Sequence, residues 1–397
     1  MKTAIVHDWL TSPGGAECVL EQMITLYPDA DLFSVCDFLD AKHRGFLRGK
    51  SPKTTFIQHL PFAGRYYRSY LPLMPLAIEQ FDLTSYDLII SSSYAVAKGV
   101  ITGPEQLHVS YVHTPVRYAW HMQYQYLHDN NLENGIKSLF ARALLHYIRT
   151  WDLSSAAGVD VFLANSEYVA QQIRRLYRRD CDVLYPPVNV EELPFSAHKQ
   201  EFFLTASRLV PYKRIELIVK AFAQMPTRRL VVVGDGPERE NVEKAALGHK
   251  NIEILGYQAK DRLHELMSQA RAFVFAAIED FGITPVEAQA CGTPVIALGR
   301  GGVLESIRPL ESRVPTGVFF MEQNEAAIIA AVECFERDGS RIMPENCRKN
   351  AQRFTSERFR TGITEIVAEQ MRNRQRIFYQ STPYRSSSNV TSSVETF

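Results

Sequence analysis

The sequence predicts an α/β protein made of two doubly wound, Rossmann-like domains that face each other across a cleft. Short apolar stretches of strand length alternate with segments of helical periodicity, which is the pattern of parallel sheets covered by helices. The alternation stops at Pro186 and Pro187 and then resumes, so it forms two blocks. The length of 397 residues suits two or three domains of roughly 150 residues each.

The first block opens with a strand at Thr3–Val6, a turn at Gly14 and Gly15, and a helical pattern over Ala16–Leu26. Strand, glycine turn and helix form the opening unit of a doubly wound nucleotide-binding fold. Further apolar stretches predict strands at 87–91, 108–112 and 159–164 and a helix at 167–177. Together these elements make an N-terminal domain over 1–185.

The second block repeats this plan after a predicted linker at 186–195, where two prolines forbid regular structure. It forms a C-terminal domain over 196–355. Its elements are strands at 202–206, 230–233, 252–255, 272–276 and 294–297 and helices at 215–224, 285–290 and 324–337.

The end of the chain is predicted to return to the first domain. A helix over 356–376 belongs to a segment, 356–380, expected to pack back toward the N-terminal domain. The Ser/Thr-rich composition of 381–397 predicts a disordered tail.

Charge is balanced over the whole chain but not along it. There are 44 basic and 44 acidic side chains, which excludes a strongly basic nucleic-acid binder and predicts no nucleic-acid partner. Residues 41–78, however, hold seven Lys and Arg and no acid, interleaved with aromatic and aliphatic side chains. This composition suits an anionic membrane surface, which attracts each cation by about 1 kcal/mol. The alternative is a solvated basic face beside a buried loop.

Neither a secretory signal nor a membrane span is predicted. The first apolar stretch ends at Asp8, and no stretch approaches 18 apolar residues. The six cysteines form no C-x-x-C pair and have no histidines at zinc-ligand spacing, which favours buried thiols in a reducing cytosol. We therefore expect a cytoplasmic protein that contacts the inner face of the cytoplasmic membrane through 41–78.

The strongest signal for chemistry is EDFGITPVE at 279–287. Glu279 follows a strand, and Gly282 precedes a helix expected to begin at Pro285, so free backbone N–H groups there can bind oxygen ligands. Glu287 lies close to the start of that helix. Two carboxylates beside free amides suit a polyhydroxylated ligand, with one carboxylate for sugar hydroxyls and one for a ribose diol. The alternative is two surface glutamates, one of which completes a helix cap.

Arg208 and Lys213 form a second candidate site, because both follow the strand 202–206. A planar guanidinium and a mobile ammonium together suit a diphosphate. Two solvated loop charges are the alternative.

Two weaker signals lie in the N-terminal domain. Gly14 and Gly15 allow close approach of a ligand, although the turn lacks both G-x-G-x-x-G and the phosphate-binding loop of ATPases. His113, at the end of the strand 108–112, can donate to a sugar hydroxyl or stabilise developing charge. Both features also have a purely structural explanation. Gly14 and Gly15 can simply form a tight turn, and His113 can be a hydrogen-bonded histidine of the core.

Together these motifs resemble the retaining glycosyltransferases of family four, which have the two-domain GT-B fold. The resemblance covers about 1–375 and rests on Glu-x7-Glu at 279–287, Arg-Leu-x3-Lys at 208–213, the Gly-Gly turn and Gly-Asp-Gly-Pro at 234–237. The stretch HTPVRYAW at 113–120 further resembles bacterial mannosyltransferases that build O-antigen and related surface polysaccharides from GDP-mannose. Arg214 departs from the glycine that many members place after the lysine.

The resemblance implies a transfer with retention at the anomeric carbon, without a metal or other cofactor. The donor would be a nucleotide sugar, GDP-mannose, and the acceptor a lipid-linked glycan on a polyprenyl diphosphate. Arg208 and Lys213 would neutralise the diphosphate leaving group, and His113 would face the transferred sugar. The remaining implied contacts are Glu279, Phe281, Gly282, Ile283 and Thr284 with the sugar, Glu287 with the ribose, Gly14 and Gly15 with phosphate or acceptor, and Gly256 and Tyr257 with the base.

Other functions share this architecture. A UDP-sugar-dependent transferase is the nearest alternative, because base contacts through backbone groups do not choose between GDP and UDP. A nucleotide-sugar epimerase, a phosphorylase and a non-catalytic binding subunit also fit the fold. The cation pair and the two glutamates argue against a scaffold, which has no need of them.

Overall fold

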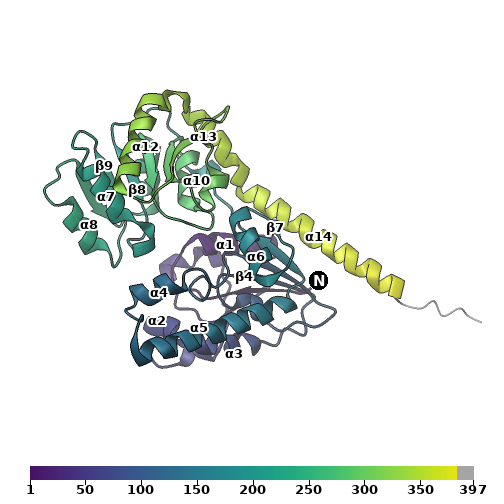
Figure 1. Cartoon of the computed structure of the whole chain (residues 1–397). Helices are drawn as coiled ribbons and strands as arrows, with labels where there is room; N and C mark the ends of the chain where they lie inside the picture. The colour runs from purple at the N-terminus through teal and green to yellow at the C-terminus, as the bar shows by residue number, and fades with distance from the viewer. Residues whose placement is uncertain (382–397) are drawn as a thin grey trace, which may run out of the picture.

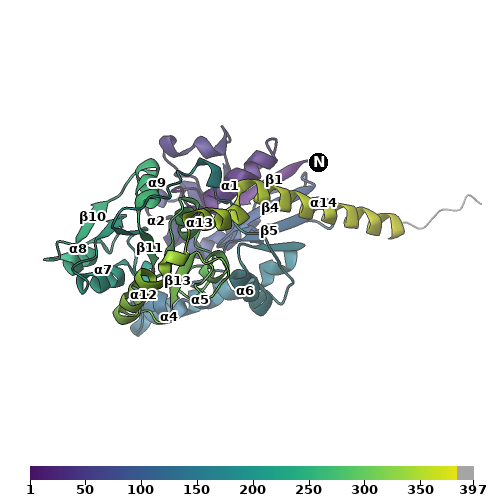
Figure 2. The same ribbon diagram turned by 90° about the horizontal axis from the view of Figure 1, so that it is seen from above.

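The computed structural model describes residues 1–381, with side chains at all of these except 375 and 377–381. Two parallel sheets lie in separate lobes, and the long helix α14 (Ser356–Ser381) runs from the second lobe along the first (Figure 1, Figure 2). The predicted fold class, two Rossmann-like α/β domains, is confirmed. The tail predicted at 381–397 lies outside the described residues from 382 onward.

The N-terminal sheet has seven strands in the order β3-β2-β1-β4-β5-β6-β7, all parallel. Their bounds are β1 Thr3–His7, β2 Asp31–Ser34, β3 Lys53–Thr54, β4 Leu88–Ser93, β5 Leu107–Val112, β6 Val161–Ala164 and β7 Asp182–Val183. The α-helices of this domain are α1 Gly15–Leu26, α2 Ala63–Tyr66, α3 Met74–Glu79, α4 Gln123–Asp129, α5 Gly135–Ser155 and α6 Glu167–Tyr177. Short 3-10 turns complete it, at η1 Ala41–His43, η2 Gly45–Leu47, η3 Phe56–His59, η4 Tyr67–Leu73, η5 Ala97–Gly99 and η6 Ala156–Gly158.

The C-terminal sheet has six parallel strands in the order β10-β9-β8-β11-β12-β13. These are β8 Phe203–Ala206, β9 Leu230–Val233, β10 Ile252–Gly256, β11 Ala272–Phe275, β12 Val295–Leu298 and β13 Gly317–Phe320. The α-helices are α7 Ile215–Ala223, α8 Arg239–Ala246, α9 Lys260–Gln269, α10 Ile283–Ala290, α11 Val303–Ser306, α12 Glu325–Asp338 and α13 Pro344–Ala351. The 3-10 turns are η7 Val190–Glu192, η8 Pro211–Lys213, η9 Gly339–Arg341 and η10 Gln352–Phe354.

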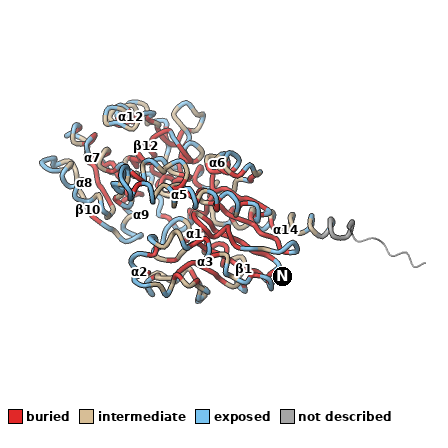
Figure 3. The backbone as a smooth tube through the Cα atoms, turned by 60° about the horizontal axis from the view of Figure 1, so that its bottom comes forward, coloured by how far each residue is buried: buried red, intermediate tan, exposed pale blue. Residues whose placement is uncertain are grey.

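Each sheet is buried on both faces, because helices cover both (Figure 3). In β1, Ile5 packs toward α1 while Ala4 and Val6 pack toward the opposite core beside α3. Phe359 and Ile363 of α14 join the α1 side, so the last helix forms part of the N-terminal core. Among residues 1–381, no helix combines the length and the apolar composition needed to cross a bilayer.

The chain crosses between the domains twice, and the two crossings lie side by side. The N–H of Val188 donates to the carbonyl of Phe354 at 2.8 Å, and Val188 forms a parallel bridge with Thr355. Val188 and Val190 are buried in the C-terminal core. The first crossing, which falls in the segment predicted as a linker, is therefore packed against one domain.

Several elements were missed at the sequence level. Strands β3 and β7 have two residues each, too few to show a pattern, and the four-residue strands β2 and β13 were missed as well. The 21-residue α5 was missed because apolar side chains lie on both of its faces, which blurs the helical periodicity. Helix α10 begins at Ile283 rather than at the predicted Pro285.

Candidate functional site

The loop that carries Arg208 and Lys213 follows β8 and is held by a neighbouring glycine turn. The N–H of Leu209 donates to the Asp235 carbonyl at 2.9 Å, and the Leu209 carbonyl accepts from the N–H of Glu238 at 3.0 Å. A Cβ on Gly234 would lie 1.8 Å from the carbonyl oxygen of Ser207. The Gly-Asp-Gly-Pro turn thus has a structural task, because only glycine permits this approach.

Lys213 and Glu279 come together at the carboxyl edge of the C-terminal sheet. The Lys213 ammonium forms an ion pair with the Glu279 carboxylate, and both side chains are mostly buried. Burial, helped by the positive charge of Arg117, lowers the pKa of Lys213 to about 8, while Asp280 opposes this change. Arg208 is exposed at the start of the same loop.

The loop bearing Glu279 is packed against the glycine run that follows β12. The Glu279 carbonyl accepts from the N–H of Gly302 at 2.9 Å. A Cβ on Gly302 would lie 2.2 Å from the Asp280 carbonyl oxygen. The glycines at 301 and 302 therefore let the Glu279 loop lie directly on this backbone.

Gly282 turns the chain into α10 with φ at +86°, in the left-handed region that favours glycine. Ile283 and Thr284 then form the first turn of the helix, whose free N–H groups can bind an anion. Phe281 contributes only its backbone, because its ring packs in the core beside Tyr185 and Phe354, at centroid distances of 5.7 and 5.2 Å.

Glu287 is half-buried in α10, one turn after the helix begins. Burial raises the pKa of its carboxyl, and Lys260 acts in the opposite direction. Lys260 follows the loop of Gly256 and Tyr257 by a few residues, so this loop lies on the Glu287 side of the site. Tyr257 is exposed, and the Gly256 carbonyl accepts from the N–H of Gly234 at 2.9 Å.

The first turn of α1 meets the first turn of α10 across the two domains. Gly14 caps α1, and a Cβ on Gly15 would lie 2.7 Å from Cδ1 of Ile283. Two helix N-termini therefore point toward one region, and both carry the partial positive charge of the helix dipole. Gly15 has the close contact expected of a turn that approaches the opposite domain.

His113 lies at the carboxyl end of β5 in a buried polar chain. Its Nε2 contacts Oγ of Ser92 at 2.9 Å, and that oxygen contacts Nδ1 of His7 at 3.0 Å. Nε2 of His7 lies 3.5 Å from the Glu17 carboxylate in the first turn of α1. Burial, together with His7, lowers the pKa of His113 to about 3, so its imidazole is neutral at physiological pH.

Arg117 and Asp280 are site residues that the sequence reasoning did not single out. The Arg117 guanidinium, from the N-terminal domain, forms an ion pair with the Asp280 carboxylate of the C-terminal domain. Both residues lie in motifs that the sequence analysis had identified, because Arg117 belongs to the HTPVRYAW stretch and Asp280 directly follows Glu279.

A second contact between the domains involves Glu305. Its carboxylate accepts from the N–H groups of Glu167 at 2.7 Å and Tyr168 at 3.0 Å, and so caps α6 from the opposite domain. No sequence motif marked Glu305.

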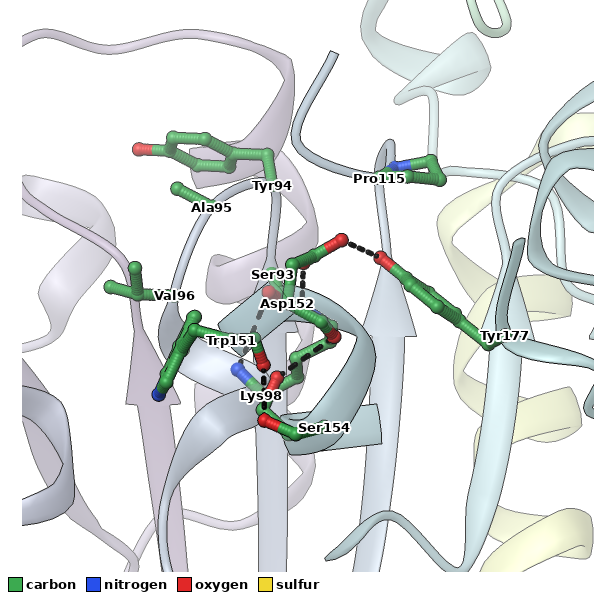
Figure 4. A network of polar contacts seen from close by, with 12 residues as sticks. Ser93, Tyr94, Ala95, Val96, Lys98, Pro115, Trp151, Asp152, Ser154 and Tyr177 are labelled. Atoms are coloured by element: carbon green, nitrogen blue, oxygen red, sulfur yellow. Dashed lines mark hydrogen bonds and ion pairs between the residues drawn. The ribbon is translucent and has the colours of Figure 1, made fainter. Parts of the chain in front are cut away.

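A buried network fixes the loop 113–120 to the helices below it (Figure 4). The Lys98 ammonium pairs with the Asp152 carboxylate, and both side chains are buried. The Tyr177 hydroxyl donates to Oδ2 of Asp152 at 2.9 Å, and the Trp120 indole donates to the same oxygen at 2.7 Å. The network thus links α5, α6 and η5 to the loop that carries Arg117.

Comparisons with known proteins show what this chain resembles. Residues 190–354 match the family model described as Glycosyl transferases group 1, which runs from one domain crossing to the other. Human Alpha-1,3/1,6-mannosyltransferase ALG2 is 30% identical over 243 residues, 52% of this chain and 56% of that protein. D-inositol 3-phosphate glycosyltransferase of Streptomyces bingchenggensis is 26% identical over 255 residues, 55% and 54%. The chain thus spans about half the length of the curated relatives it matches.

Among solved structures, the crystal structure of Anabaena Alr3699/HepE in complex with UDP is similar over 93% of this chain and 100% of that chain. Its TM-score is 0.67 at 20% identity. The overall architecture is the GT-B fold of glycosyltransferases.

Proposed function

We propose that the protein is a retaining glycosyltransferase that moves mannose from GDP-mannose to a lipid-linked oligosaccharide in bacterial surface-polysaccharide biosynthesis. The observation that carries the proposal is the contact between Lys213 and Glu279 at the carboxyl edge of the C-terminal sheet. A cation for the diphosphate and a carboxylate for the sugar are then adjacent, as the two halves of a nucleotide sugar require. The mannose choice is supported by the HTPVRYAW stretch and by the similarity to a human mannosyltransferase.

The reacting bond lies between the anomeric carbon and a diphosphate oxygen. As it breaks, negative charge develops on the diphosphate, and stabilising that charge is the largest catalytic task. Lys213, Arg208 and the first turns of α1 and α10 supply positive charge from fixed positions. A bound donor would replace the ion pair, with Lys213 on the diphosphate and Glu279 on sugar hydroxyls.

The other site residues extend this arrangement. Glu287 would hold the ribose, and the backbone of Gly256 and Tyr257 would meet the base. His113, held neutral, can hydrogen-bond a sugar hydroxyl without adding a positive charge beside the developing oxocarbenium ion. We further propose that no metal is needed, so chelation by EDTA should leave the transfer rate unchanged.

A transfer assay with GDP-mannose, UDP-glucose and UDP-N-acetylglucosamine, with a lipid-linked acceptor, tests the proposal. Lys213→Ala should lower kcat by about 100-fold or more, as expected for loss of a preorganised charge, with an unchanged melting temperature. The matched control is Lys220→Ala, which removes an exposed lysine paired only with Glu216 on α7. Near-normal transfer by the Lys213 variant would refute this assignment, and release of an epimerised free donor would instead identify an epimerase.

A UDP-sugar donor is the second candidate, favoured by the similarity to a structure that was solved with UDP. A thermal-shift screen across nucleoside diphosphates separates the two, because a ligand that binds the native state raises the melting temperature. A rise in melting temperature with GDP alone supports GDP-mannose as the donor. A rise with UDP alone supports a UDP-sugar donor instead.

For the proposed membrane contact through 41–78, the side-chain contacts of this segment support a smaller region. Arg44 pairs with Asp37 at 2.7 Å, Lys53 pairs with Asp31 at 3.4 Å, and Lys50 donates to backbone carbonyls. Residues around η2 pack on the α1 side of the sheet, whereas η4 packs on the opposite side. Exposed cations beside exposed aromatic rings remain at 62–68, so we place the contact with the cytoplasmic leaflet there.

A further inference from the structure

Helix α5 presents large apolar side chains to solvent on its N-terminal half. Ile136 is 87% exposed, Leu139 71% and Phe140 73%. With Ala143 and Tyr147, which are also exposed, these residues recur at helical spacing and form one continuous stripe. We call these five residues the α5 stripe.

The opposite face of α5 already has its partners. Leu145, Ile148 and Trp151 are buried against the N-terminal domain. A helix that is apolar on its solvent face as well as its core face is unusual for a surface helix, whose outer face is normally polar. Within the described residues nothing covers the α5 stripe, so it is available to an outside partner.

The charges within residues 135–151, which carry the α5 stripe, have one sign. Residues 135–151 contain Lys137, Arg142 and Arg149 and no acid. Lys137 is exposed within the stripe, whereas Arg149 is used internally, donating to the Ala119 carbonyl at 2.8 Å. The nearest acids along the chain are Glu133 and Asp152; Glu133 contacts His128 at 3.2 Å, and Asp152, in the last turns of α5, is buried in its pair with Lys98.

A second exposed apolar and cationic segment belongs to the same part of the domain. Leu71 of η4 packs against the cluster of Leu127 and Leu145, so η4 lies beside α4 and α5. In the view of Figure 1, helices α2, α3 and α5 all lie in the lower part of the N-terminal domain. Tyr124 of α4 is also exposed. The segment with the exposed residues at 62–68 thus continues into η4, which packs against the buried face of α5.

We propose that the α5 stripe docks into the surface of an anionic lipid bilayer, with Ile136, Leu139 and Phe140 inserted among the lipids. Exposed apolar and aromatic side chains beside cations are the composition of helices that lie in a membrane interface. The cations match the negative surface potential of such a membrane. A protein partner would also cover apolar side chains, but the segment 135–151 of α5, which holds Lys137, Arg142 and Arg149 and no acid, favours an anionic surface. The inference deepens the proposed function, because a lipid-linked acceptor would be reached from that surface.

The test is cosedimentation of the full chain with vesicles, in the absence of any substrate. Vesicles of phosphatidylglycerol and phosphatidylethanolamine are compared with vesicles of phosphatidylcholine alone. The wild type should bind the anionic vesicles, and the double variant Leu139→Asp with Phe140→Asp should bind them about tenfold less, since it removes two inserting groups and adds two negative charges. A milder double change, Leu139→Ser with Phe140→Ser, should reduce binding less, and equal melting temperatures establish folding.

Two matched controls keep the result specific. Leu153→Asp changes a residue of α5 that is 47% exposed but lies off the stripe, and Leu247→Asp changes one that is 81% exposed in the C-terminal domain. Both should bind vesicles as the wild type does. Unchanged binding by the stripe variants would overturn the proposal, as would a wild-type dimer in size-exclusion chromatography that the stripe variants convert to monomer.

The same proteins are screened for a thermal shift with GDP and UDP. A chain that binds anionic vesicles through the α5 stripe but no nucleotide would remove the proposed function and leave this inference standing. A chain that binds nucleotide but no anionic vesicle would overturn this inference and leave the proposed function standing.

Discussion

Arg117 of the N-terminal domain and Asp280 of the C-terminal domain form an ion pair directly beside the pair formed by Lys213 and Glu279. Two cations from different domains thus lie near two consecutive carboxylates of one loop. The arrangement couples the separation of the domains to the charge at the candidate diphosphate site.

Replacing Arg117 by Gln should raise the pKa of Lys213, because the positive charge of Arg117 helps to lower it. Lys213 loses its charge as the pH rises through about 8, so nucleotide binding should weaken above that pH in the wild type. In the Arg117→Gln variant, the pH at which nucleotide binding weakens should be higher than in the wild type. Calorimetric titration of GDP between pH 7 and 10 measures this, and an unshifted profile would contradict the placement of Arg117 beside Lys213.

Gly302→Ala should abolish transfer while the sheets remain folded. The new Cβ would lie 2.2 Å from the Asp280 carbonyl, so the loop that carries Glu279 has to move. A displacement of about 1 Å at a reacting centre can cost about 100-fold in rate. Gly45→Ala, where a Cβ meets nothing within 4 Å, is the control and should retain wild-type activity. Measured kcat in both variants decides the matter.

Asp152→Ala should destabilise the protein by about 3–5 kcal/mol, the range found when one partner of a buried ion pair is removed. Lys98 would remain buried without its counterion, and the Trp120 and Tyr177 donors would lose their acceptor. Denaturant unfolding measures the change. Glu216→Ala, which breaks an exposed pair with Lys220 on α7, should cost about 0.5 kcal/mol or less.

Arg214→Gly should stabilise the chain by up to about 1 kcal/mol. Arg214 has φ at +56°, a left-handed conformation that is strained for a residue with a Cβ, and its side chain is exposed. Arg214→Ala keeps that strain and should bring no gain. Thermal unfolding of both variants tests the explanation, which also accounts for the glycine expected at this position from the family resemblance.

The sequence was sufficient to predict the fold class, because buried strands such as β9 and β12 are apolar along their whole length. It also singled out Lys213 and Glu279 separately, each at the end of a strand. Their contact, and the contact between Arg117 and Asp280, depend on how loops from distant strands pack, and no local pattern encodes that. Glu305 is the clearest example of a contact that the sequence does not predict. Its partners are backbone N–H groups of the other domain, which every residue except proline has, so no sequence motif marks them.

The position of α14 has a consequence for the order in which the protein can fold during synthesis. Phe359, Ile363 and Val367 belong to the core of the first domain, yet the ribosome makes them after the whole second domain. Domains usually fold in the order in which they emerge. Here the first domain must wait with an open apolar groove beside α1 until residues more than 350 positions from its first strand arrive. The nascent first domain thus exposes this apolar groove, and the risk of aggregation, while the whole second domain is translated, until α14 has been made.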